Sequence, residues 1–143
     1  MRPMTMWALL ILLVASASIP RSSTAAETAP SLVTLTEAEI LVYFVPQAMQ
    51  VRAEGMDIGW EEDSSPKDNR KDFYYFFLYN AKRPNAANAT IGHFAVNKHT
   101  ADVWNAVTLE MVASRELAGI QKILRRAHHI DQRTMEKYKS TNF

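Results

Sequence analysis

Between Asp72 and Tyr79 the chain reads DFYYFFLY, in which every position after the first is aromatic or aliphatic. Alternate side chains of a strand point to opposite faces. One face would therefore carry Phe73, Tyr75, Phe77 and Tyr79, and the other Tyr74, Phe76 and Leu78. A strand that is apolar on both faces is normally covered on both. The pattern predicts an inner strand sheltered by a helix, a partner chain or a ligand.

Upstream of this strand the apolar residues follow a helical spacing. Thr36 and Glu39 have the spacing of a capping box, and Leu35 and Ile40 are placed to form a hydrophobic staple. We therefore expect a helix to begin at Thr36. Its apolar stripe would consist of Ile40, Leu41, Phe44, Val45 and Ala48.

Pro46 should interrupt this helix. It has no N–H to donate, and it disfavours helical geometry at Val45, so we expect a break and a short second turn before Gly55. Residues 56–61 then alternate apolar and polar side chains, which predicts an edge strand or a half-buried strand. A charged loop follows over residues 61–71.

Residues 90–97 and 102–107 form a predicted β-hairpin that closes around residues 97–101. Its candidates for the core are Phe94, Val96, Val103 and Trp104. The order of these elements predicts an α+β fold, with one antiparallel sheet of about four strands packed by an N-terminal helix and C-terminal helices.

The last major helix should begin after Ser114, a favourable N-cap residue. Its expected apolar stripe is Leu117, Ile120, Ile123, Leu124 and Ala127. Its opposite side carries Arg115, Lys122 and Arg126, with Arg125 nearby. Asp131 is placed to cap a short terminal helix, which would set Met135 and Tyr138 against the body of the domain.

The N-terminal residues have the pattern of a secretory signal. A single basic residue precedes the apolar run over residues 6–14, and a small-x-small cleavage site follows at residues 15–17. The apolar run is too short to span a membrane, so residues 1–17 are predicted to be cleaved, leaving no stable membrane span. A second possible cut follows Ala25 or Ala26.

Composition agrees with one exported, folded domain. Residues 18–34 read as a flexible leader and residues 35–143 as a single α+β domain. The chain is 48% hydrophobic, has no cysteine and carries a net charge of +1, which argues against disorder and against a general nucleic-acid binder. We expect a secreted or periplasmic protein of the bacterial envelope whose core needs no disulfide.

The candidate chemistry is sparse. Of the four histidines, only His93 can be brought near His99 or Asp102 by the hairpin. The chain has no G-x-S-x-G motif, no H-E-x-x-H motif and no Gly-rich phosphate loop. We therefore expect no metal and no cofactor. Residues 111–143 contain seven basic and three acidic side chains. That excess indicates either an anionic partner or an ordinary solvated helix face.

Residues 92–104 (GHFAVNKHTADVW) resemble a hairpin found in small exported bacterial α+β domains, including PepSY-like and NTF2/cystatin-like immunity and inhibitor families. The chain departs from that pattern at Asn97, where the pattern has Asp, and at Ala101, where it has Gly for a left-handed turn. An alanine there would be strained or would shift the turn. The resemblance implies a non-catalytic domain that binds or inhibits an envelope protein.

Three hypotheses follow. The first is an exported binding module that contacts an envelope protein or small ligand; its candidate binding residues are Tyr75, Tyr79, Trp104, Arg125 and Arg126. The second is an NTF2-like enzyme with a pocket lined by Tyr75, Tyr79, His93 and Trp104, using His93 and Asp102 as acid and base. The third is a homodimeric structural protein. The enzyme hypothesis requires His93 and Asp102 to meet.

Overall fold

The computed structural model of the chain describes residues 30–62, 71–82 and 89–139. The predicted signal at residues 1–17 lies outside these ranges. The described elements, in chain order, are α1 (Leu35–Tyr43), α2 (Pro46–Ala53), β1 (Ile58–Glu62), β2 (Phe73–Asn80), β3 (Thr90–Asn97), β4 (Val103–Asn105), β5 (Glu110–Met111), α3 (Arg115–Ala127) and α4 (Gln132–Lys139).

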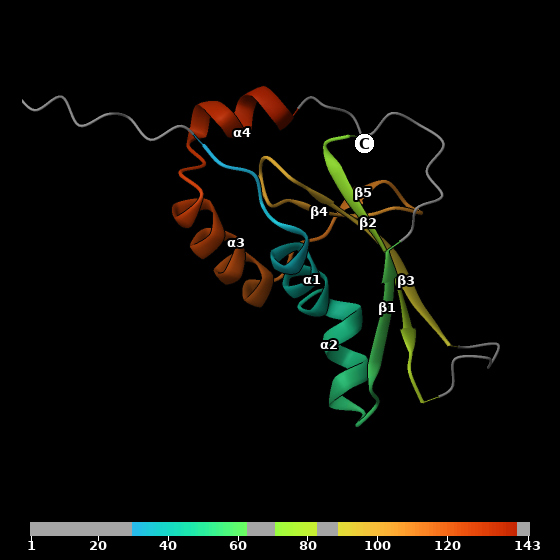
Figure 1. Cartoon of the computed structure of the whole chain (residues 1–143). Helices are drawn as coiled ribbons and strands as arrows, with labels where there is room; N and C mark the ends of the chain where they lie inside the picture. The colour runs from blue at the N-terminus through green and yellow to red at the C-terminus, as the bar shows by residue number, and fades with distance from the viewer. Residues whose placement is uncertain (1–29, 63–70, 83–88, 140–143) are drawn as a thin grey trace, which may run out of the picture.

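The strands form one antiparallel sheet in the order β1-β2-β3-β4-β5, so each strand pairs with its neighbours in the sequence (Figure 1). The predicted α+β fold is confirmed, with five strands in place of about four. The additional strand, β5, has only two residues, too few for an alternating pattern to reveal. The predicted inner strand is β2, which lies between β1 and β3.

The helix α1 starts two residues earlier than predicted. Thr34 is its N-cap and accepts from the Glu37 N–H, while the Glu37 carboxylate accepts from the Thr34 N–H. The sequence TLTEAE contains the capping-box spacing twice, and the prediction of Thr36 with Glu39 was wrong. Starting at Thr34 lets α1 bury Ala38, Leu41 and Val42, and leaves Ile40 44% exposed.

The predicted break at Pro46 is confirmed. Pro46 is the first residue of α2, a position where the missing N–H costs nothing because first-turn N–H groups have no partner within the helix. Val45, before it, is extended. Gly55 follows the helix with φ +76°, a left-handed conformation that glycine adopts without strain.

The core lies between the sheet and the helices. α1 contacts α3, β2 and β3, and α2 contacts β1 and β3. The sheet face beneath them carries Phe76, Leu78, Phe94, Val96 and Val103, all essentially inaccessible to solvent. Trp60 meets Phe76 edge to face, with ring centroids 5.6 Å apart. Of the four hairpin candidates for this core, three are confirmed, but Trp104 points to the other face because it alternates with Val103.

Both caps predicted for the C-terminal helices are confirmed. The Ser114 side chain accepts from the Leu117 N–H, and Asp131 accepts from the Thr134 N–H at 2.7 Å. The predicted apolar stripe of α3 is wrong at two positions, since Ile123 is 68% exposed and Ala127 is also exposed. The polar residue Gln121 is buried instead. Within the described ranges no helix has the length and apolar character that crossing a bilayer requires.

The packed domain begins before Leu35, where we expected the leader to end. Val33 is fully buried and donates its N–H to the Lys98 carbonyl at 2.8 Å. Ser31 donates its N–H to the His128 carbonyl at 3.0 Å. These bonds fasten residues 31–33 to the turn after β3 and to the end of α3.

Candidate functional site

The sheet face opposite the helices carries all three aromatic side chains proposed for binding. Tyr75, Phe77 and Tyr79 alternate with the buried residues of β2 and are half-buried. Phe77 of β2 pairs with His93 of β3. Ala95 of β3 pairs with Tyr75 on one side and with Trp104 of β4 on the other. Paired residues project to the same face. We call this surface the aromatic face; its members are Tyr75, Phe77, Tyr79, His93 and Trp104.

The rings of the aromatic face contact one another. Phe77 stacks on Tyr79 with centroids 5.7 Å apart, and it lies 4.9 Å from the His93 ring. The Tyr79 ring lies across Gly59 of β1, where a Cβ atom would come within 2.5 Å of the ring. Gly59 thus permits the ring to lie flat on the sheet. The result is a row of three aromatic rings, Tyr79, Phe77 and His93, in which Phe77 contacts the other two.

The prediction that both faces of β2 are covered is confirmed for one face. The helices cover Phe76 and Leu78. On the other face Phe73 is buried at 6% exposure, whereas Phe77 and Tyr79 keep partial exposure to solvent. Four residues of the hypothetical enzyme pocket, Tyr75, Tyr79, His93 and Trp104, do share one face. They form a sheet surface, and none of them lines the groove of about 950 Å³ that the described residues enclose elsewhere.

His93 and Asp102 do not meet. The ring of His93 lies on the aromatic face against Phe77, four residues along β3 from Asn97, the residue that pairs with Asp102. At the rise of a strand this separation is about 13 Å. The carboxylate of Asp102 is turned to α3. The acid–base pair that the enzyme hypothesis requires is therefore absent from this geometry.

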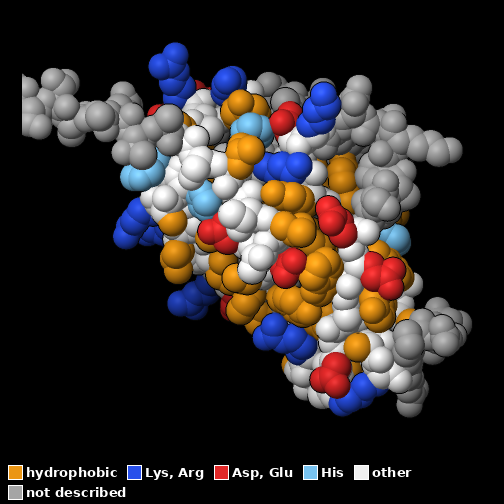
Figure 2. Space-filling view, viewed as in Figure 1, with side chains coloured by type: hydrophobic (Ala, Val, Ile, Leu, Met, Phe, Trp, Pro, Cys, Tyr) orange, Lys and Arg blue, Asp and Glu red, His pale blue; other side chains and the backbone are white. Residues whose placement is uncertain are grey.

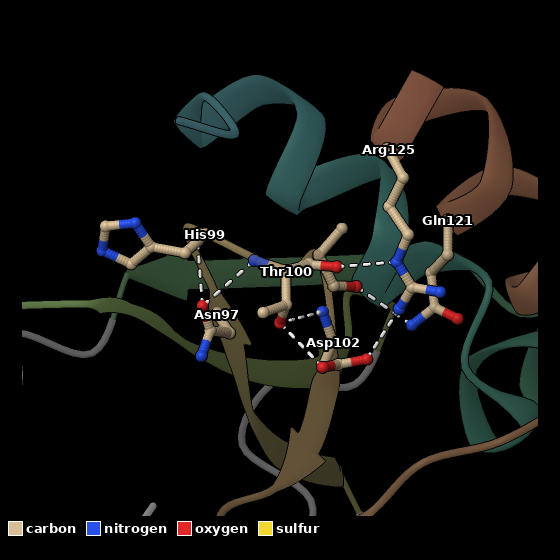
Figure 3. Close-up of polar contacts among 7 residues, drawn as sticks. Asn97, His99, Thr100, Asp102, Gln121 and Arg125 are labelled. Carbon is tan, nitrogen blue, oxygen red and sulfur yellow. Dashed lines mark hydrogen bonds and ion pairs between the residues drawn. The ribbon is translucent and has the colours of Figure 1, made fainter. Parts of the chain in front are cut away.

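Asp102 instead belongs to a network that joins α3 to the turn between β3 and β4 (Figure 3). Its Oδ1 accepts from Arg125 Nη2 at 2.7 Å, and its Oδ2 accepts from the Thr100 hydroxyl at 2.7 Å. Arg125 Nε also donates to the Thr100 carbonyl at 2.8 Å. Arg125, with 28% of its side chain exposed, is thus bonded to the fold, and its expected role in ligand binding stays a prediction.

The same network holds the strained turn that the sequence predicted. Ala101 has φ +60° and is fully buried, so it occupies a left-handed position where the resembling hairpins have glycine. Its carbonyl accepts from the buried Gln121 amide at 3.0 Å. Asn97 Oδ1 accepts from the N–H groups of His99 and Thr100. These bonds offset the cost of the left-handed alanine.

Arg126, the other basic candidate, is exposed. It lies in the last turn of α3, next to Arg125, but shares none of its contacts with the β3–β4 turn. Figure 2 shows Lys, Arg and His side chains gathered over the region of α3 and α4. Of the two adjacent arginines, Arg126 is the more exposed, and only Arg125 is paired with Asp102.

A hydrogen-bonded chain that sequence reasoning missed links Ser31, His128 and Glu37. Ser31 Oγ lies 2.7 Å from His128 Nδ1, and His128 Nε2 lies 2.8 Å from Glu37 Oε2. Burial acts to raise the pKa of Glu37, but the hydrogen bonds from Thr34 and His128 outweigh it and lower the pKa. The Ser31 N–H already bonds the His128 carbonyl, so it is not free to stabilise an oxyanion. These hydrogen bonds fasten residues 31–37 to the end of α3.

No family model and no curated protein sequence matches this chain. Its fold is similar to that of a chain in a solved type VI secretion system effector–immunity complex from Pseudomonas protegens. The TM-score is 0.55 at 16% sequence identity, and the match covers 76% of this chain and 87% of the other. The shared feature is therefore the arrangement of helices and sheet.

Proposed function

We propose that this chain is a non-enzymatic, immunity-like binding module that uses its aromatic face to bind a protein partner and block its action. The observation that carries the proposal is the partly exposed row of Phe77 and Tyr79 on the sheet face that the helices leave open. Aromatic side chains are enriched at protein interfaces because they bury a large area at a low cost in conformational entropy. A preformed row reduces that cost further.

Two further observations support a protein partner. A chain of an effector–immunity complex has this fold, which makes the architecture suitable for a protein that acts within a complex. The candidate acid–base pair is separated, so the geometry favours binding over the enzyme hypothesis. Fold similarity alone does not define function, and the proposal therefore depends on the aromatic face.

The test compares capture of a specific partner by the wild type and by Tyr79→Ser. Envelope extract of the source organism would be passed over the immobilised chain, and a captured protein would then be purified and titrated by calorimetry. We expect Tyr79→Ser to weaken binding at least about ten-fold, as loss of an interface hot spot does. Ile123→Ser, a change at an exposed position on α3, serves as the control. Equal binding by both variants and the wild type would refute the proposal.

Gly59→Ala provides a second test of the aromatic face. The added methyl would displace the Tyr79 ring while leaving the phenol intact, so binding should weaken with little loss of stability. Light scattering of the purified chain addresses the homodimer hypothesis. A dimer that Tyr79→Ser dissociates would assign the aromatic face to self-association instead of a foreign partner.

We propose further that the protein works outside the cytoplasm, as a secreted or periplasmic protein of a bacterial envelope. The support is the signal pattern at residues 1–17. Mass spectrometry of the periplasmic fraction should find a chain that begins after Ala17, or after Ala25 or Ala26. A full-length chain confined to the cytoplasmic fraction would contradict export.

A further inference from the structure

A groove of about 950 Å³ lies where the end of α3, the start of α4 and residues 30–32 come together. The side chains of Arg126, Arg133 and Lys137 line it, and all three are exposed. The rings of His99 and Tyr138 form another wall, stacked in parallel with centroids 3.7 Å apart. None of the residues of the aromatic face contributes to this groove.

The charge of the groove is positive. Arg125 also lines it, but its charge is balanced by Asp102. The carboxylate in the lining belongs to Asp131, which caps α4 through the Thr134 N–H. Three cations therefore face one carboxylate. The negative end of the α3 dipole and the positive end of the α4 dipole meet here and oppose each other, so the side chains determine the field.

The groove is held in shape before any ligand arrives. The bonds of Ser31 to His128 fix the segment that forms one wall, and the buried Val33 anchors it from below. On this wall Leu32 is 50% exposed, which places an apolar side chain beside the cations. A preorganised site loses little entropy on binding.

We infer that this groove binds an acidic segment of a protein, whose carboxylates pair with Arg126, Arg133 and Lys137 and whose apolar side chains pack on Leu32. Charge complementarity identifies the occupant. The chain's own residues 18–29 contain one arginine and one glutamate, so they lack the negative charge that the groove would select. That the acidic segment belongs to the partner of the aromatic face rests on the proposed function.

The test measures binding of a fluorescein-labelled decapeptide with alternating Asp and Glu residues, by fluorescence polarisation of the purified chain. Its control is the same peptide with Asn and Gln. We expect the double variant Arg126→Gln, Arg133→Gln to weaken binding of the acidic peptide by about ten-fold or more, and higher salt to weaken binding to the wild type. The matched control is Arg115→Gln, Lys139→Gln, which removes the same charge from exposed positions outside the groove.

Three outcomes would overturn the inference. They are no saturable binding at low salt, equal loss in both double variants, and tighter binding to a DNA oligonucleotide or to phosphatidylglycerol vesicles than to the peptide. Tyr79→Ser separates this inference from the proposed function, since it should leave peptide binding unchanged. If a partner is captured in a way that depends on Tyr79 but the acidic peptide does not bind, the inference about the groove is refuted and the proposed function stands. Binding of the peptide without any partner for the aromatic face would refute the proposed function alone.

Discussion

Arg125 Nη2 donates to Asp102 Oδ1 at 2.7 Å, and this ion pair joins the last turn of α3 to the turn between β3 and β4. The two side chains are 28% and 15% exposed, so the pair is partly shielded from water. Removing the Arg125 guanidinium would leave the Asp102 carboxylate in a poorly solvated position without this hydrogen bond and without the opposite charge beside it. Such a change costs more than the loss of a surface ion pair.

Arg125→Gln should therefore lower the free energy of unfolding by about 2 kcal/mol, as expected for hydrogen bonds to a charged group. Arg126→Gln, one residue along and exposed, should change it by less than about 0.5 kcal/mol. Urea unfolding of both variants measures the difference. Equal effects would mean that the ion pair contributes nothing specific to the attachment of α3.

Adjacent phenylalanines of β2 provide a test of the sheet. Phe76 is 1% exposed in the core, and Phe76→Ala should cost about 3 to 5 kcal/mol because it leaves a cavity. Phe77 is half-buried on the aromatic face, and Phe77→Ala should cost less than about 2 kcal/mol because solvent can fill the space. If thermal unfolding ranks the two variants in the opposite order, the assignment of the faces is wrong.

The position of the capping box can be tested with two threonines. Thr34→Ala should destabilise the protein by about 1 kcal/mol, the usual cost of losing an N-cap side chain. Thr36→Ala should change stability by less than about 0.5 kcal/mol, since Thr36 is exposed within the first turn and alanine is a good helix former. A larger loss for Thr36→Ala would restore the helix start that the sequence alone suggested.

Glu37 should make stability depend on pH in the acid range. Its pKa in the folded protein is lowered from the ordinary value of 4.5, so the unfolded chain binds the proton more readily. The resulting stability is fully present above pH 4.5 and is lost as pH falls through the folded pKa. Glu37→Gln should cost about 1 to 2 kcal/mol at neutral pH through its weakened bonds to His128 and Thr34.

Chemical unfolding of the wild type and Glu37→Gln from pH 7 to pH 3 measures this dependence. The gap between the two proteins should narrow as the wild-type carboxyl becomes protonated. Glu39→Gln, on the same helix but without these bonds, is the control. A gap that stays constant over this range would show that the carboxylate charge is not the stabilising element.

The left-handed turn predicts unequal responses to two small changes at Ala101. Valine is strongly disfavoured at φ +60° and adds volume to a buried position, so Ala101→Val should cost about 2 kcal/mol or more. Ala101→Gly should stay within about 1 kcal/mol of the wild type, because relief of strain offsets the lost methyl contact. A tolerated valine would mean that the turn can adopt another conformation.

Short-range patterns in the sequence were sufficient for much of the fold. Pro46 ends one helix and begins the next because the effect of its ring is local. Ser114 and Asp131 cap their helices because a side chain reaches an N–H only three residues away. Alternation placed Phe76 and Phe77 on opposite faces of an inner strand. Each of these features depends on neighbours within one turn or a few strand residues.

Only the tertiary structure decided the rest. Both Thr34 and Thr36 have the spacing of a capping box. Thr34 is the N-cap in the structure, where its partner Glu37 also bonds His128, 91 residues away. The sequence alone allowed Asp102 to face either His93 or α3. In the structure its carboxylate faces α3 because it pairs with Arg125, 23 residues further along the chain. The cations of the groove come together only when α4 folds back beside α3 and residues 30–32. Local periodicity carries no information on such pairings, because they depend on where distant segments pack.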